Sequence, residues 1–135
     1  MTMSGPATLF DLARGGMSAQ LVRMNAAASN LANAGTVSAS EDEAYRPIRA
    51  VFAEDLGRAS GLSSVRVSGV LREAAAPVRQ RDPDHPLADA NGDIWTSPVN
   101  ENAEMVEMLE AARQYQNLVE ALSTAKQLML ETMRL

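Results

Sequence analysis

The two ends of this chain carry its longest amphipathic patterns, and a proline-rich segment separates them. Near the N-terminus Phe10, Met17, Met24 and Leu31 recur every seven residues, which is the spacing of a helix with one apolar face. Four of the six prolines fall within residues 77–98, so a long helix is excluded there. We therefore predict an α+β chain whose long N- and C-terminal helices pack as a coiled coil, with a small β-containing region between them.

Local signals set the limits of three regions. Thr8 and Asp11 have the spacing of a capping box at a helix start. Gly35 suits the left-handed residue that often follows a helix end. The predicted regions are an N-terminal helix (1–35), a loop and small β-rich middle (36–98), and a C-terminal helix (99–135).

The middle region contains short alternating segments rather than helical patterns. Residues 36–44 are polar and read as a flexible loop. Alternation from Tyr45 to Ala53 and from Val65 toward Leu71 predicts two strands. Shorter extended pieces are expected at Val78–Arg81 and Ile94–Thr96, with a turn between them at Ala90–Asp93. These segments are too short for a large sheet, so we expect a small one.

Gly15 and Gly16 interrupt the N-terminal helix. Each glycine costs about 1 kcal/mol relative to alanine in a helix interior. The pair is either a tolerated bend or a place where a neighbouring helix approaches closely.

The C-terminal helix has an apolar seam whose members are three and four residues apart. Ser97 or Asn100 is expected to cap it. Glutamates fill its first turns, where the helix dipole favours negative charge, and they read as a solvated surface. Lys126 interrupts the seam, either as a register-setting residue or, more simply, with its stem packed and its ammonium in water.

Composition argues against chemistry and for assembly. The net charge of −5 gives no basic surface for nucleic acid, and the chain has no cysteine for a thiolate metal site. His85, the single histidine, lies in a proline-rich loop. No catalytic residue, cofactor, metal or small-molecule substrate is expected. Aromatic residues make up only 4% of the chain, so its core should be thin and completed by neighbours.

The termini and the apolar stretches also bear on location. No segment approaches the roughly 18 apolar residues of a membrane helix. The N-terminus lacks a basic segment followed by an apolar one, so no cleaved signal peptide is expected.

The apolar faces of the two helices are the predicted assembly surface. They are rich in methionine, whose flexible side chain packs against similar but non-identical neighbours. Asn30 and Asn33 are candidate polar specifiers of that surface, and Asn33 could serve only to end the helix. The full prediction comprises Phe10, Met17, Leu21, Met24, Asn30, Leu31 and Asn33 in the first helix, and Met105, Met108, Ala112, Tyr115, Val119, Leu122 and Met129 in the last.

Three segments resemble a known family. The run Asn25–Asn33, which contains Ser-Asn-Leu-Ala-Asn, resembles the N-terminal motif of bacterial flagellar rod and hook proteins. His85–Gly92 and residues 104–130, with Ala-Arg-Gln-Tyr-Gln at their centre, narrow the resemblance to proximal-rod members of that family. The similarity extends over nearly the whole chain.

The resemblance implies a structural subunit of the flagellar drive shaft. Members of the family pack their terminal helices in the inner layer of a tube, while a β-rich middle faces outward. The implied partners are other rod proteins, further copies of the chain, the flagellar type III export apparatus and the surrounding basal-body rings. The implied location is the periplasmic rod, reached without a cleaved signal.

Two alternatives differ from this prediction in class. A soluble helical-hairpin adaptor would bind partners outside any polymer, and it would keep stable helical ends as an isolated monomer. A hydrolase would use His85 with Asp84 or Asp89. A rod subunit, in contrast, is expected to order its thin helical ends on assembly.

Overall fold

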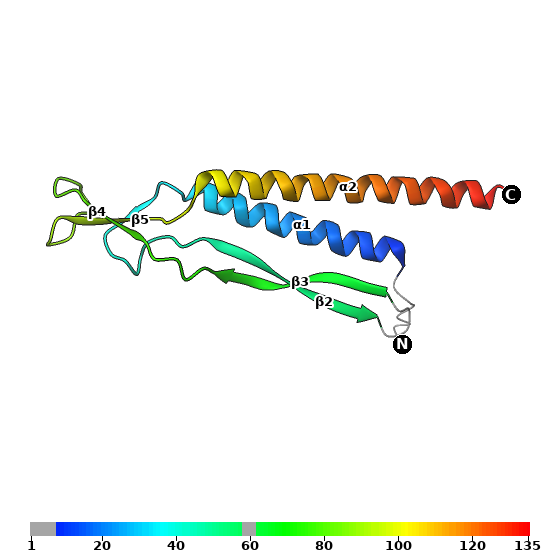
Figure 1. Ribbon diagram of the computed structural model, residues 1–135, viewed down its shortest axis with the longest axis horizontal. Coiled ribbons are helices and arrows are strands. Elements are labelled where there is room, and N and C mark those ends of the chain that lie inside the picture. The colour runs from blue at the N-terminus through cyan, green and yellow to red at the C-terminus, as the bar shows by residue number, and fades with distance from the viewer. Residues whose placement is uncertain (1–7, 58–61) are drawn as a thin grey trace.

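Two antiparallel helices and a β-hairpin run side by side along the long axis of the molecule (Figure 1). The computed structural model describes residues 8–57 and 62–135. In it, α1 spans Leu9–Ala32 and α2 spans Glu101–Met133. Helix α1 contacts both α2 and the hairpin, so it forms the middle layer. The α+β prediction, with its two packed terminal helices, is confirmed.

Helix α1 begins as predicted but ends differently. The Asp11 N–H donates to Thr8 Oγ1 at 3.2 Å and the Thr8 N–H donates to Asp11 Oδ2 at 3.1 Å, which completes the capping box. At the other end the capping residue is Asn33, with φ −105° and ψ 6°. Among the described residues only Gly92 has a positive φ, of 78°. The prediction of a left-handed Gly35 was therefore wrong.

The reason lies in the side chains that close this helix end. Asn33 Nδ2 donates to the Ser29 carbonyl at 2.8 Å. The Asn33 carbonyl then accepts the Thr36 N–H at 3.2 Å and the Thr36 hydroxyl at 2.8 Å. These bonds satisfy carbonyls that a glycine-based ending would otherwise cap.

Helix α2 is capped by Asn100, whose side chain accepts the Ala103 N–H at 3.1 Å. At 33 residues it is longer than the 24-residue α1, and its C-terminal part extends past the start of α1 (Figure 1). Residues 126–135 are all exposed. Neither helix in the described part of the chain has the length and apolar character needed to cross a bilayer.

The hairpin comprises β2 (Ile48–Gly57) and β3 (Leu62–Arg72), paired antiparallel. We call these two strands the arm. Both were predicted, but β2 begins three residues later and ends four residues later than expected, and β3 extends beyond the predicted segment at both ends. The register shifts between Val51 and Phe52, a bulge that changes the local twist of the pair. Residues 58–61 lie outside the described residues.

A second, smaller sheet lies at the opposite end of the molecule from the arm's tip (Figure 1). Its antiparallel order is β1 (Val37–Ser38), β5 (Asp93–Thr96) and β4 (Val78–Arg81). Strands β4 and β5 were predicted as extended pieces. The prediction that residues 36–44 are only a loop missed β1, because its partner β5 is more than 50 positions away in the sequence.

The turn before β5 forms as its sequence predicted. Asp89 Oδ1 accepts the backbone N–H groups of Asn91 at 2.8 Å and Asp93 at 2.9 Å. Gly92 takes the positive φ that this turn requires.

The interior is built almost entirely from alanine. Apart from Pro47 and Pro77, the buried apolar residues among those described are six alanines and one isoleucine: Ala13, Ala19, Ala26, Ala27, Ala44, Ile94 and Ala111. Such small side chains bury little area each, but they let the elements approach closely. The expected thin core is therefore confirmed.

Candidate assembly surface

Helix α1 turns two of its faces toward other parts of the chain. A Cβ added to Gly16 would lie 3.0 Å from Leu118 Cδ1 of α2, and one added to Gly15 would lie 3.1 Å from the Val65 carbonyl oxygen of β3. The glycine pair thus permits two close approaches, to a helix as one alternative predicted and also to a strand. A third face of α1 is left over.

The predicted N-terminal stripe lies on this third face. At 3.6 residues per turn, Phe10, Met17 and Leu21 project well away from the direction in which Gly15 meets the arm. Leu21 is 43% exposed, and Phe10, Met17, Met24 and Leu31 are half-buried. None of these large side chains is enclosed by the chain itself.

The predicted stripe of α2 is covered to a similar extent. Ala111 is buried against α1. Met105, Val119 and Met129 are exposed. The other predicted members are half-buried, namely Met108, Ala112, Tyr115 and Leu122.

The two stripes share one side of the helix pair. In an antiparallel pair, the helical rotation places the α1 stripe and the α2 stripe on the same side of the plane through both axes. The arm contacts α1 from the other side. We call the shared surface the flank: Phe10, Met17, Leu21, Met24 and Leu31 of α1, with Met105, Met108, Ala112, Tyr115, Val119, Leu122 and Met129 of α2.

The side of the pair opposite the flank is charged. Arg23 Nε donates to Glu107, and Arg23 Nη2 lies 3.3 Å from Glu110 Oε2. The hydrogen bond from Arg23 lowers the pKa of the Glu107 carboxyl, and the same bond raises the pKa of Arg23. One side of the pair is thus joined by ions and the other presents apolar side chains.

The two predicted asparagines are used inside the chain. Asn30 is completely buried. Its Oδ1 accepts the Ile48 N–H at 2.9 Å and the Tyr45 hydroxyl at 2.8 Å, while its Nδ2 donates to the Ile48 carbonyl at 3.0 Å. Asn33 closes the end of α1. In this conformation Asn30 has no exposed surface with which to contact a neighbouring subunit. We therefore assign it the role of holding the chain's own arm against α1.

Sequence reasoning missed a second fastening, between the arm and α2. Arg49 Nη1 donates to Glu104 Oε2 at 2.9 Å, and Arg49 Nη2 donates to the other oxygen of that carboxylate. Arg49 Nε also donates to Glu73 Oε1 at 2.7 Å. Glu104 is only 1% exposed, so its prediction as a solvated glutamate was wrong. Hydrogen bonding to Glu104 raises the pKa of Arg49.

A signal for this pair was present in the α2 pattern. Glu104 stands seven residues before Ala111 and so lies on the same inward-facing side of the helix. Its partner Arg49 is 55 positions away, a separation that no local pattern reveals.

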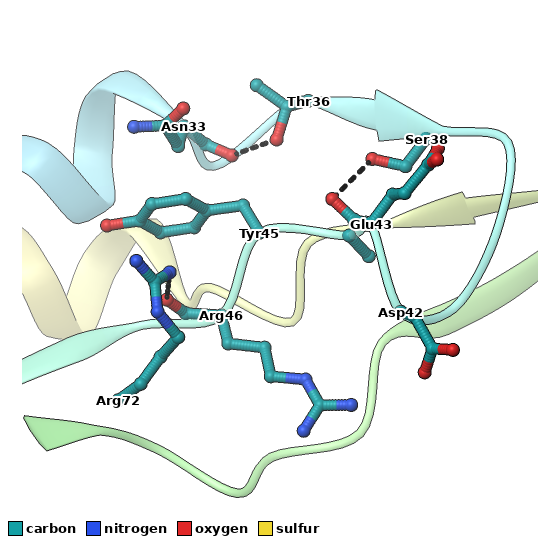
Figure 2. A pocket seen from close by; sticks show the side chains of 9 residues that line it. Asn33, Thr36, Ser38, Asp42, Glu43, Tyr45, Arg46 and Arg72 are labelled. Atoms are coloured by element: carbon teal, nitrogen blue, oxygen red, sulfur yellow. Dashed lines mark hydrogen bonds between the residues drawn. The ribbon is translucent and has the colours of Figure 1, made fainter.

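A polar pocket of about 640 Å³ lies between the end of α1, the following loop and the base of the arm (Figure 2). Figure 2 shows the Tyr45 ring over the Arg72 guanidinium, which lies 5.6 Å from the ring centroid. Arg72 Nη1 donates to the Arg46 carbonyl at 3.2 Å, and Ser38 Oγ donates to the Glu43 carbonyl at 3.2 Å. These two bonds and the one from Thr36 to Asn33 join lining residues through backbone carbonyls, which suits a structural junction.

The residues considered for chemistry are placed in turns. His85 Nδ1 accepts the Leu87 N–H at 3.0 Å, and Asp89 closes the turn described above. Within residues 8–57 and 62–135, no three histidine, cysteine, aspartate or glutamate side chains gather where they could hold a metal ion. The described chain does present apolar surface, on the flank.

Two family models match the chain. The model described as "Flagella basal body rod protein" matches residues 10–39, and "Flagellar basal body rod FlgEFG protein C-terminal" matches residues 90–135. The matched segments contain β1 and all of α1 except Leu9, and β5 with α2. They therefore include both halves of the flank.

Curated relatives cover nearly the whole chain. It is 39% identical over 127 residues to the flagellar basal-body rod protein FlgC of Salmonella typhimurium, covering 94% of this chain and 95% of the relative. It is 40% identical over 129 residues to FlgC of Yersinia enterocolitica, with the same coverage. FlgC of Agrobacterium fabrum is 30% identical over 125 residues. The chain belongs to the FlgC family of flagellar basal-body rod proteins.

Proposed function

We propose that this chain is a structural subunit of the flagellar proximal rod, and that it polymerises into the drive shaft that transmits motor torque. The observation that carries the proposal is the flank: it lies on the two helices that the rod-family models match, and its large side chains remain partly exposed. Exposed apolar surface of this extent on a thin-cored protein marks a contact surface.

The flank is the surface that meets neighbouring subunits. Its methionines and leucines gain burial only when another helix covers them. The neighbours are further copies of the chain and other rod proteins. On this proposal residues 1–35 and 99–135 form the inner, axial part of the subunit, and residues 36–98 lie outside it.

The route to the rod follows from the same family assignment. The subunit passes through the flagellar type III export apparatus without a cleaved signal peptide and joins the rod in the periplasmic space. Contacts with the basal-body rings would involve the outward-facing middle region. This route is supported by the Asn25–Asn33 motif, which resembles the N-terminal motif of flagellar rod and hook proteins.

Charge on the flank tests the proposal. Leu21→Glu and Val119→Glu each place a carboxylate at a residue that is 43% exposed, so the isolated fold should tolerate them. Burying an unpaired carboxylate in a subunit contact costs several kcal/mol, which should block rod assembly. Ser18→Glu is the matched control, an exposed α1 position outside the flank.

Motility, the subunit content of purified basal bodies and the cellular protein level are measured together. We expect the two flank variants to be present in the cell but absent from basal bodies, and the Ser18 variant to swim normally. Basal bodies of normal composition in both flank variants would overturn the proposal. Protease-resistant helical ends in the isolated monomer would instead favour the adaptor.

A further inference from the structure

The base of the arm is joined to the last turn of α1 by one buried side chain. We propose that Asn30 is a clamp that makes the position of the arm depend on the helical state of α1. The chain then has a built-in route by which ordering of its N-terminal helix positions its outer hairpin.

The clamp replaces a missing backbone partner. The Asn30 amide pairs with both the N–H and the C=O of Ile48, the first residue of β2. A third bond comes from the Tyr45 hydroxyl, which also lies 3.1 Å from Ser29 Oγ. Two successive residues of α1 therefore hold the segment that leads into the arm.

The geometry requires the helix. Asn30 lies three residues before the C-cap of α1, so its side-chain direction is set by the last helical turn. If that turn unwinds, Ile48 loses both of its partners, and unpaired polar groups in a buried place are costly. Conversely, the fixed Ile48 backbone satisfies a side chain that is completely buried, so the arm stabilises the helix end by the same bonds.

The neighbouring contacts extend the clamp to the rest of the arm's base. Arg49, the next residue, holds Glu104 of α2. The other strand is closed by the Glu73 N–H, which donates to the Pro47 carbonyl at 2.7 Å. Three consecutive residues, Pro47 to Arg49, thus tie α1, α2 and β3 together at one point.

The consequence rests on the proposed function. If rod neighbours bind the flank and order α1, linkage requires that they also favour the clamped arm. Assembly of the inner helices would then set the position of the outer hairpin without any direct contact to it.

Amide hydrogen exchange on the isolated full-length chain tests the clamp. The amides of Ala26 and Ala27 report on α1, and the amide of Ile48 reports on the arm. Protection is followed from urea, which unfolds the chain, to trimethylamine oxide, which favours its compact state. In the wild-type chain we expect both reporters to gain protection over the same range of conditions.

Asn30→Leu is the decisive variant. Leucine has nearly the shape of asparagine and a higher helix propensity, so weaker α1 cannot explain a loss at Ile48. We expect Ile48 to exchange at least about tenfold faster, as loss of a buried hydrogen-bond partner implies, while the α1 amides keep their protection. Tyr45→Phe removes one of the three bonds and should shift Ile48 in the same direction by less.

Asn33→Ala is the control at the helix end, because Asn33 makes no bond to the arm. In this variant the amide of Ile48 should lose no more protection than the amides of α1 lose. Wild-type-like protection of Ile48 in Asn30→Leu would overturn the proposal, as would wild-type reporters that gain protection under different conditions. Neither result depends on rod assembly, so the clamp and the proposed function can fail separately.

Discussion

The inward faces of the helices and the flank use opposite kinds of residue. Inside, α1 meets α2 and the arm through glycine, alanine and asparagine, and its buried residues are Ala13, Ala19, Ala26, Ala27 and Asn30. On the flank stand phenylalanine, leucine, methionine, valine and tyrosine, and none of them is buried. The monomer thus leaves the large apolar side chains of the flank at least partly exposed.

The difference indicates that one set of residues stabilises the fold and another set serves the proposed assembly. Small residues and specific polar bonds fix the geometry of the subunit, since close-packed backbones leave little freedom. Large flexible side chains contribute area only when covered. Changes inside should therefore damage the fold, and changes on the flank should spare it.

The largest expected effect comes from the ion pair between the buried Glu104 carboxylate and Arg49, whose side chain is 38% exposed. Arg49→Met leaves the Glu104 carboxylate enclosed without its cation, which should cost about 3 kcal/mol of unfolding free energy. Urea denaturation measures this loss. The double variant Arg49→Met/Glu104→Met removes the buried charge as well and should recover much of the stability.

The matched control is a looser pair with an exposed cation, whose carboxylate is less buried than Glu104. Arg79 Nε lies 3.8 Å from Asp93 Oδ2, and the Arg79 side chain is mostly exposed. Arg79→Met should change stability by less than about 1 kcal/mol. Equal losses at Arg49 and Arg79 would show that burial of Glu104 has no energetic weight.

Two neighbouring alanines of α1 allow the most direct comparison between its inward face and its exposed surface. Ala27 is completely buried, and Ala28 is exposed. Ala27→Leu should force the packed elements apart and cost about 1–3 kcal/mol. Ala28→Leu should change stability by no more than about 0.5 kcal/mol. Thermal melts of both variants compare them, and similar melting temperatures would contradict the division.

Gly15 and Gly16 allow a comparison between the two inward contacts of α1, one with the arm and one with α2. Alanine at either position gains about 1 kcal/mol of helix propensity. At Gly16 the new Cβ meets a leucine side chain, which can rotate away, so Gly16→Ala should be neutral or slightly stabilising. At Gly15 it meets the Val65 backbone carbonyl at 3.1 Å, which cannot move alone.

We therefore expect Gly15→Ala to be less stable than Gly16→Ala by about 1 kcal/mol, roughly the propensity gain that the clash offsets. Urea midpoints at equal slope give the comparison. A Gly16→Ala chain that is the less stable of the two would mean that the helix contact, not the strand contact, limits the approach.

Sequence patterns predicted the parts of this fold that local forces decide. The Thr8–Asp11 capping box, the Asn100 cap of α2 and the turn at Asp89 depend on residues within four positions of one another. Strands β2 and β3 followed from alternation. The heptad residues of α1 lie on one side of the helix, and their part in assembly stays a prediction.

The contacts between distant segments could not be predicted in the same way. The roles of Asn30 and Glu104 depend on Ile48 and Arg49, which only the folded chain brings near. The seam pattern also could not show that α1 would meet α2 through alanine and glycine beside its seam, with Leu118 of α2 against Gly16. That choice follows from the close approach of three elements around α1.

The smallest effect expected is a response to acid at the ionic side of the helix pair. The Arg23 hydrogen bond lowers the pKa of Glu107 from its usual 4.5. A lowered folded pKa means that the pair contributes stability above about pH 4.5, and that this contribution disappears as pH falls through the folded pKa. Because Glu107 is partly exposed, the loss should be only about 0.5 kcal/mol.

Stability curves between pH 7 and pH 3 measure this loss in the wild type, in Glu107→Gln and in Glu120→Gln. Glutamine at 107 cannot titrate, so that variant should start lower at pH 7 and decline less toward pH 3. Glu120 is exposed on the same helix, so its variant should follow the wild-type curve. If Glu107→Gln declined as steeply as the wild type, the ionic side of the pair would contribute nothing, and the small buried residues alone would join the two helices.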